Sequence, residues 1–585
     1  MLSLCGLALV GLLPQGCGYT LFSDDKRIND LLARKSLQIG GGADAPARDF
    51  EQPQSLGLRD ARLNSKQPDT TNPAASELQF SRADESRDVA QRLRNLQTQS
   101  EQGAIELTLS AALAQAQKTA RELLNQQDEY ILSAIRLLTE RHLWDPRLSN
   151  EGSVRFESSQ TDGDVESVLR IMNDLRVSQR LPYGGEVAAR WVWDISENLR
   201  SAATGQYVQS SRLILQGNIP LLRGAGLIAQ EGLIQAERDL IYSARDYERF
   251  RREFLVSIAN DFFDLLQQQA SIRNSEEQLR SFEGVEEKEK ALYDAGRHRL
   301  LDLNNAANRA LEARSQVATL RDRYVLAVDR FKVRLGIPTD VPVKIEPSSL
   351  DVPEPEISLE QASEYALAFR LDLQNQRDRV EDSRRGVRNA RNELLPDLNI
   401  GADVTFPTDA DAREGGAVYE PDDVTYGLSA TYSLPLDKEN ERLAVRSSII
   451  RLQQRVRDYE RERDDIVVRV RQRVRAIELA RFNITLAQKR VEISDRRVYE
   501  TELKKEEIDT QQRLDALIDQ LAARNALDQA VTDLRNAVLD YLLETGQLRV
   551  SRTGELERLP GMSPPVPPSP SPDSPPPPDA PIPVP

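Results

Sequence analysis

Residues 398–406 read LNIGADVTF, and apolar side chains alternate with polar or small ones along the whole stretch. The same period of two returns at residues 425–436, which read TYGLSATYSLPL. Successive side chains of a β-strand point to opposite faces, so both stretches predict two-faced strands. Each has about the 9–11 residues that a tilted strand needs to cross a bilayer. The residues that mark these predicted barrel strands are Ile400, Val404, Phe406, Tyr426, Leu428 and Tyr432.

A less regular version of the pattern occurs earlier in the chain. Residues 187–195 read VAARWVWDI, and a return strand is expected over Tyr207–Pro220. Trp191 and Trp193 suit the aromatic girdle of a membrane barrel. Four strands per chain cannot close a barrel alone, and an open sheet cannot stand in lipid because its edges are unpaired. Three chains with four strands each would close a twelve-stranded barrel; the alternative is two soluble hairpins packed on a helix.

The strands belong to an internal duplication. The tripeptide at 219–221 (IPL) recurs as LPL at 434–436, and the opening of the first copy at 107–109 (LTL) recurs as ISL at 357–359. We call the tripeptides at 219–221 and 434–436 the Pro-Leu marks. The two openings are farther apart in sequence than the two Pro-Leu marks, so the first copy has a longer insertion before its Pro-Leu mark. Each copy is expected to run helix, strand pair, long helix, turn, long helix.

Seven-residue spacing of apolar side chains predicts the long helices. Such spacing, with charges between, is typical of coiled coils. Gly336, at the end of one helical run, has its counterpart in Gly546. A helix over about 227–283 would be roughly 85 Å long at 1.5 Å per residue. The four series are Leu233, Leu240, Tyr247 and Phe254; Leu303, Ala310, Val317, Tyr324 and Phe331; Val470, Ile477, Ile484, Val491 and Val498; and Leu527, Leu534 and Tyr541.

The composition favours extended helical architecture over a large compact core. Of 585 residues, 39% are hydrophobic and 29% are charged, whereas globular domains average roughly 45–50% apolar residues. Lys and Arg total 77 and Asp and Glu total 93, so the net charge is −16. That acidity argues against a nucleic-acid partner, which would require a basic surface.

Residue types for catalysis or cofactor binding are scarce. The chain has two histidines, His142 and His298, and two cysteines, Cys5 and Cys17. Its sequence has no Walker A loop, GxSxG, HExxH or nucleotide-binding glycine fingerprint. A Cys/His zinc site and a Ser-His or Cys-His mechanism are therefore disfavoured. The sequence predicts a protein that is not an enzyme and uses no cofactor or metal; a cell-envelope hydrolase with a carboxylate pair is the enzymatic alternative.

The N-terminus predicts export. An apolar run over residues 2–13 precedes Pro14-Gln15-Gly16-Cys17 and resembles a bacterial lipoprotein signal, in which the cysteine is acylated. A simple cleaved signal is the alternative. The expected organisation is a signal with its lipidation motif (1–17), a flexible polar segment with one short helix (18–105), a first repeat (106–340), a Pro-rich linker (341–356), a second repeat (357–550) and a Pro-rich disordered tail (551–585).

Taken in order, these features resemble the TolC-like outer membrane efflux family over roughly residues 105–550. The segment at 394–398 (LLPDL) is similar to the family's approach to a strand, and 433–436 (SLPL) and 218–222 (NIPLL) to its return from a strand to a helix. The segment YDAG at 293–296, followed by LLDL at 300–303, is similar to the family's helical tip turn. The second tip, with EEIDT at 506–510, lacks the glycine of the first.

The resemblance implies a mainly α-helical fold with a membrane β-barrel contribution. Each protomer of a homotrimer would supply four strands to a twelve-stranded barrel in outer membrane lipid, and long helices to a periplasmic tunnel. The expected location is the outer membrane of a diderm bacterium. The expected partners are a periplasmic adaptor and an inner-membrane transporter, and the expected function is a passive exit duct for drugs, metals or other cargo.

Two sets of tip residues follow from the resemblance. The first set would dock the adaptor: Gly296, Leu300, Leu301, Asp302, Arg513, Leu514 and Asp515. The second would line a narrow periplasmic aperture as a ring of carboxylates that favours cations: Asp294, Glu506, Glu507, Asp509 and Asp519. For each acid, the alternative is a solvated helix face. The rival function for the whole chain is a lipid-anchored periplasmic coiled-coil scaffold without a pore.

Overall fold

A computed structural model describes residues 26–34, 104–161, 164–198, 207–347, 358–408, 421–503, 509–551 and 556–558. The chain divides into two compact units. Unit 1 holds residues 127–247 and 372–461 together with the N-terminal part to residue 52, and unit 2 holds residues 53–126, 248–371 and 462–585. Cys17, Glu506, Glu507 and nearly all of the Pro-rich tail lie outside the described residues.

Two pairs of helices open the two copies of the repeat. In the first copy α4 spans Leu109–Thr119 and α5 spans Arg121–His142. In the second copy α8 spans Leu359–Phe369 and α9 spans Leu371–Asn392. In both pairs the first helix has 11 residues and the second has 22. The predicted duplication is therefore present in the helices that open each copy.

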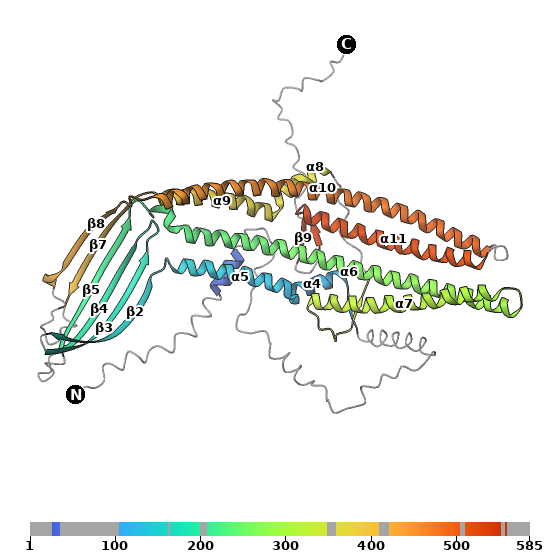
Figure 1. Cartoon of the computed structure of the whole chain (residues 1–585), viewed down its shortest axis with the longest axis horizontal. Helices are drawn as coiled ribbons and strands as arrows, with labels where there is room; N and C mark the ends of the chain where they lie inside the picture. The colour runs from blue at the N-terminus through green and yellow to red at the C-terminus, as the bar shows by residue number, and fades with distance from the viewer. Residues whose placement is uncertain are drawn as a thin grey trace, which may run out of the picture. The chain divides into compact units, whose positions relative to one another are not determined.

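Each copy continues into two long helices (Figure 1). In the first copy α6 covers Glu231–Asp294 and α7 covers Leu300–Leu335. In the second copy α10 covers Glu439–Leu503 and α11 covers Thr510–Glu544. Several of the predicted heptad residues are buried, among them Leu240, Phe254, Val470 and Ile477, whereas others such as Ile484 are half-buried. A five-residue 3-10 helix, η3 (Gly226–Gln230), leads into α6.

Glycines with positive φ end three of the helical runs. The backbone N–H of Ile337 donates to Lys332 O at 2.8 Å, and that of Gly336 donates to Val333 O at 3.1 Å. This is the Schellman pattern, in which a left-handed residue after the helix satisfies its last carbonyls. The same pair of bonds occurs around Gly296 and Gly546, and the φ values of the three glycines are 70–73°.

A six-stranded antiparallel sheet in unit 1 follows the order β2-β3-β4-β5-β7-β8 (Figure 1). The first copy supplies β2 (Arg147–Thr161), β3 (Asp164–Arg180), β4 (Glu186–Asn198) and β5 (Tyr207–Pro220). The second copy supplies β7 (Asp397–Pro407) and β8 (Thr425–Ser433), which η4 (Pro421–Asp423) precedes. The four expected strands are β4, β5, β7 and β8.

The strands β2 and β3 were not expected. After α5 the chain enters β2 through the same short connection that leads from α9 into β7. Sequence reasoning missed β2 because Ser, Asn, Gly and Glu dilute its alternation, and β3 because charged side chains fill one of its faces. The longer insertion predicted for the first copy is therefore made of additional strand.

Small strands pair outside the main sheet. In unit 2, β1 (Ile105–Leu107) runs parallel to β6 (Val343–Ile345), and β9 (Leu548–Val550) runs antiparallel to β10 (Leu556–Arg558).

The short helix expected in the N-terminal segment lies at residues 26–34. Its Ile28, Leu31 and Leu32 join Tyr130 of α5 and Leu240 of α6 in a core of unit 1. Among the helices of the described residues, none has an apolar stretch long enough to cross a membrane.

Candidate functional site

The main sheet has one apolar face that the described chain leaves uncovered. Large hydrophobic side chains on all six strands are exposed, and the strand registers place them on one face. Those predicted from sequence as barrel residues are Trp191, Trp193, Ile400, Tyr426, Leu428 and Tyr432, and the half-buried Val404 and Phe406 share the face. The others are Leu148, Val154, Phe156, Ile171, Val177, Val187, Leu215 and Ile219.

The opposite face of the sheet is polar and pairs its charges across strands. Arg170 of β3 binds Asp194 of β4, and Arg190 of β4 binds Asp174 of β3. Arg176 of β3 donates to Glu186 of β4 at 2.5 Å. Opposite charges on neighbouring strands stabilise a sheet by roughly 0.2–1 kcal/mol per pair. A hollow of about 530 Å³ on this face is lined by charged and hydroxyl side chains: Arg155, Glu157, Arg170, Asp194, Ser210, Ser211, Arg212 and Thr408, with Val168 and Pro407.

The junction between sheet and helices is fixed by polar contacts. Arg223, after β5, donates to Glu393 at 2.7 Å, and the backbone N–H of Gly224 donates to Asn392 Oδ1 at 2.8 Å. The N–H of Leu221 donates to Leu398 O at 2.8 Å. The Pro-Leu mark of the first copy thus lies where its return strand meets the first strand of the second copy.

The first tip is an ordered turn between α6 and α7. Gly296 has a φ of 71° and has no atom within 4 Å of the position that a Cβ would take. Leu300 and Leu301, the first residues of α7, are 52% and 61% exposed, and Asp302 lies in the same first turn. Four of the residues predicted to dock an adaptor are therefore together at one end of unit 2, with two of them presenting apolar side chains.

The same turn contains a buried acid that sequence reasoning did not identify. The Glu289 side chain is 1% exposed, and its Oε2 lies 2.6 Å from Nδ1 of His298, which is 37% exposed. His298 is an exposed residue, and its ring is bound to α6 through this contact. A local signal existed, because the two residues lie close in sequence on either side of the turn. Charge-assisted hydrogen bonds of this kind are short and strong.

Replacing one partner of this pair should cost more than replacing both. We expect His298→Ala to destabilise the tip by about 1–3 kcal/mol, because it leaves the Glu289 carboxylate buried without its partner. The double variant Glu289→Met/His298→Ala should recover most of the loss. Limited proteolysis at the tip turn measures both, and equal cleavage of the two variants would contradict the role of the pair.

The second tip is described only on its α11 side. Asp509 is the N-cap residue of α11, Arg513 and Asp515 are half-buried, and Gln511 Nε2 donates to Asp515 Oδ1 at 3.0 Å. Leu514, in contrast, is 0% exposed and packs with Phe282 and Ala310 in a core of unit 2. Its side chain therefore holds helices together and is not available to an adaptor, which corrects its expected docking role.

Of the predicted aperture acids, the structure describes Asp294, Asp509 and Asp519. Asp294 is exposed at the end of α6, and Asp519 of α11 forms an ion pair with Arg497 of α10. Glu506 and Glu507 lie outside the described residues. Elsewhere in unit 2, burial raises the pKa of Asp261, Asp264 and Asp540; Arg334 opposes the shift at Asp261 and Arg473 opposes it at Asp540.

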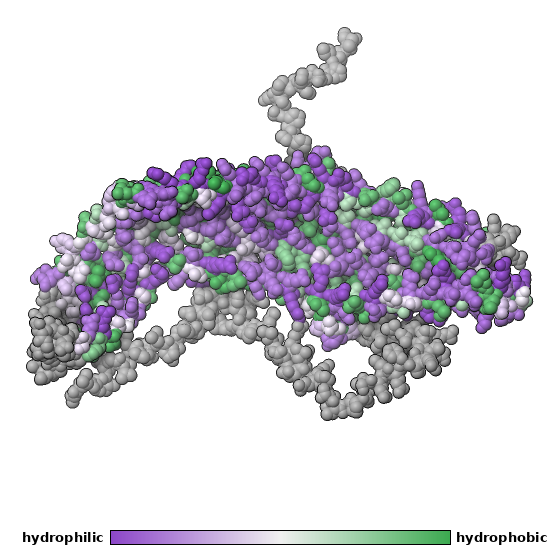
Figure 2. Space-filling model, viewed as in Figure 1, coloured by the Kyte–Doolittle hydropathy of each residue, from purple (hydrophilic) through white to green (hydrophobic). Residues whose placement is uncertain are grey.

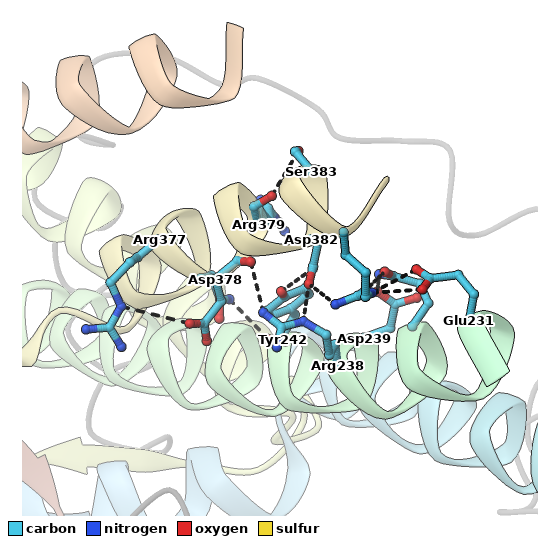
Figure 3. A network of polar contacts seen from close by, with 12 residues as sticks. Glu231, Arg238, Asp239, Tyr242, Arg377, Asp378, Arg379, Asp382 and Ser383 are labelled. Carbon is cyan, nitrogen blue, oxygen red and sulfur yellow. Dashed lines mark hydrogen bonds and ion pairs between the residues drawn. The ribbon is translucent and has the colours of Figure 1, made fainter. Parts of the chain in front are cut away.

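A dense polar network joins α6 to α9 within unit 1. Figure 3 shows Arg238 and Tyr242 of α6 pointing toward Asp378 and Asp382 of α9. Arg238 and the Tyr242 hydroxyl both bind the Asp382 carboxylate, and the backbone O of Asp378 accepts from Arg238 at 2.9 Å. Burial and then the bond to Asp382 raise the pKa of Tyr242. Because these groups satisfy one another, the network serves to hold two helices together.

The described residues contain no group of three or more His, Cys, Asp or Glu side chains that could hold a metal ion. The features that stand out are therefore a two-faced sheet, a helical tip and helix-locking networks. A sheet with one uncovered apolar face and one charged face can separate lipid from water.

Known proteins share this architecture. Residues 362–506 match a family model described as outer membrane efflux protein. Three solved structures have similar folds, each with a TM-score of 0.58 and 75% of this chain covered. They are the outer-membrane channel OprN (16% identity, 89% of that chain), the CmeC outer membrane channel of Campylobacter jejuni (14%, 85%) and the outer membrane protein VceC of Vibrio cholerae (13%, 96%). Among curated proteins, none matches the sequence.

Proposed function

Starting from a chain that matches the outer membrane efflux protein model and has the fold of outer-membrane channels, we propose that it is the outer membrane duct of a tripartite export system. Three copies would join their sheets into a barrel and their helices into a periplasmic tunnel. An inner-membrane transporter and a periplasmic adaptor would deliver the cargo. The duct itself would be passive and make or break no bonds.

The observation that carries the proposal is the uncovered apolar face of the sheet. Its exposed side chains span all six strands without interruption, from Leu148 on β2 to Leu428 on β8. Soluble proteins seldom leave so continuous an apolar surface in water, whereas a membrane barrel turns it toward lipid. The charged opposite face would then line a water-filled path. A periplasmic scaffold without a pore offers no reason for this division of faces.

A second apolar surface supports assembly into a trimer. Leu479, Leu486 and Ile493 follow a heptad on α10 and are 59%, 43% and 66% exposed. They lie on a different face from the heptad residues Val470 and Ile477, which are fully buried in unit 2. Most of the face of the molecule drawn in Figure 2 is hydrophilic, with smaller hydrophobic areas between. A second heptad stripe left bare within one chain is the pattern by which helices pack against another copy.

The tips and the N-terminus take their roles within this proposal. Leu300, Leu301 and Asp302 would contact the adaptor, with Arg513 and Asp515 at the second tip. Asp294, Asp509 and Asp519 would face their counterparts from the other copies at the aperture, where rings of like charge select for cations. Acylation of Cys17 would anchor the N-terminus to the membrane that the barrel crosses.

The native mass of the chain without residues 1–17, with and without detergent, tests the proposal. We expect a trimer that needs detergent, because the sheet still faces lipid after the lipidated residue is removed. Conductance across a planar bilayer is then the confirming measurement. A water-soluble monomer or elongated dimer would instead overturn the duct and leave the lipid-anchored scaffold as the better account.

Substitution by arginine at two neighbouring residues of β7 should prevent assembly at one position and leave it unchanged at the other. Val404 lies on the apolar face and Thr405 on the polar face, and the two side chains are similar in size and shape. We expect Val404→Arg to cost about 2–4 kcal/mol per copy when the side chain faces the middle of the lipid layer, and to abolish detergent-stable assembly. Thr405→Arg should assemble normally. Trimer yield by size-exclusion chromatography measures both, and equal yields would contradict the assigned faces.

A further inference from the structure

The first copy of the repeat has two strands more than the second. Both copies enter the sheet at equivalent points, through β2 after α5 and through β7 after α9. From that point to the Pro-Leu mark, the first copy runs over residues 147–220 and the second only over 397–435. The excess in the first copy is as long as the segment 164–198, which holds β3 and β4. It follows that β2 corresponds to β7 and β5 to β8, and that β3 and β4 are the inserted strands.

The insertion lies inside the sheet and not at its edge. The order β2-β3-β4-β5-β7-β8 places β3 and β4 between the first and last strands of their copy. They pair with their neighbours over long registers, since β2 and β3 pair from Arg147 to Thr161 and β4 and β5 pair from Glu186 to Glu197. A barrel built from this sheet must therefore include β3 and β4 in its wall.

The inserted strands have the same two faces as the rest of the sheet. Ile171 and Val177 of β3 and Trp191 and Trp193 of β4 continue the exposed apolar face. On the other face, the three Arg–carboxylate pairs described above all join β3 to β4. Both inserted strands could therefore stand in a barrel wall, with their apolar face toward lipid and their charged face toward water.

Close packing anchors the turn between the inserted strands. Gly184 and Gly185 have φ values of 100° and 89°, and a Cβ on Gly185 would lie 2.0 Å from Asn218 O at the end of β5. The N–H of Gly226 donates to Tyr183 O at 2.8 Å. The turn is thus seated against the return strand, which fixes the insertion in the sheet at this end.

On the basis of the proposed function, we infer that the assembled barrel has eighteen strands, in which β8 of each copy pairs with β2 of the next. The two edge strands run in opposite directions, because directions alternate along the six antiparallel strands. An antiparallel joint therefore closes a ring of three copies. A second copy of this chain is the partner that both edges fit, and the barrel is wider than four strands per copy would make it.

The diameter of the barrel distinguishes the two strand numbers. With strands about 4.8 Å apart and tilted by about 40°, a ring of eighteen has a backbone diameter of about 36 Å, and a ring of twelve about 24 Å. We expect electron cryomicroscopy of the full chain in detergent to show a threefold ring of the larger size. A variant without residues 162–198, in which β2 can pair with β5, should give the smaller ring.

The possible results separate this inference from the proposed function. A threefold ring of about 24 Å in the unaltered chain, by the strand spacing and tilt used above, would overturn the eighteen-stranded barrel and leave the duct in place. Particles without a ring would overturn the duct itself. The large ring in the unaltered chain supports the inference whether or not the shortened variant folds.

Discussion

Gly336→Ala is expected to destabilise the protein by about 3 kcal/mol or more, because the substitution combines an unfavourable φ with a backbone clash. The Cβ of an alanine would lie 2.2 Å from the carbonyl oxygen of Thr119 at the end of α4, and φ is 73°. Thr119 has little freedom to retreat, since its hydroxyl donates to Leu335 O at 2.5 Å. Chemical denaturation followed by helical circular dichroism measures the loss.

Two other glycines provide matched controls with the same backbone conformation. A Cβ on Gly546 would lie 3.3 Å from Phe369, and one on Gly296 would meet nothing within 4 Å. The φ penalty alone is roughly 1–2 kcal/mol, so the expected order of loss is Gly336→Ala, then Gly546→Ala, then Gly296→Ala. Equal losses at all three positions would show that φ alone matters and that the contact with Thr119 does not.

Glu248→Ala should cost about 3–5 kcal/mol, because it leaves buried guanidinium groups without their counter-charge. Glu248 accepts from Arg251 Nη1 at 3.2 Å and from Arg252 Nε at 2.9 Å, and all three residues are buried. Burial and then the charge of Arg252 lower the pKa of Arg549, while Glu248 raises it. Removing the acid therefore leaves a crowded set of cations in unit 2.

An exposed ion pair gives the comparison for this substitution. Arg309 and Glu312 on α7 are 2.9 Å apart, with side chains 38% and 65% exposed. Glu312→Ala removes a carboxylate from a pair of similar distance, and we expect it to change the free energy of unfolding by no more than about 0.5 kcal/mol. A comparable loss in both variants, measured by denaturation under the same conditions, would contradict the importance of burial.

Much of the fold could be predicted because its repeats are regular in sequence. Heptads such as Val470 and Ile477 revealed the long helices, and the alternation at 398–406 revealed β7. The match of residues 362–506 and the channel fold confirm the resemblance to the TolC-like outer membrane efflux family and the mainly helical fold class. The strand β3 was not predicted, because a strand with paired charges on one face has only a weak pattern of hydrophobic residues.

The site was harder to predict, since local spacing does not show what a residue packs against. Leu514 looked like a tip residue by its place after the turn, yet it is buried against α6 and α7. Glu289 stands in a run of charged residues at 286–290, and the turn after α6 brings His298 into contact with it. For Leu514 the deciding neighbours come from helices distant in sequence, which a single sequence does not reveal, whereas for Glu289 the deciding neighbour lies across the turn, only nine residues away.

The position of the inserted strands implies a parity rule for this architecture. The α5 helix and the start of α6 both adjoin the same end of the sheet, so the chain between them must contain an even number of strands to return there. A wall of this kind can therefore grow only by whole hairpins, while the helices that flank it keep their lengths. The second copy, still with two strands, could accept a hairpin between β7 and β8 in the same way.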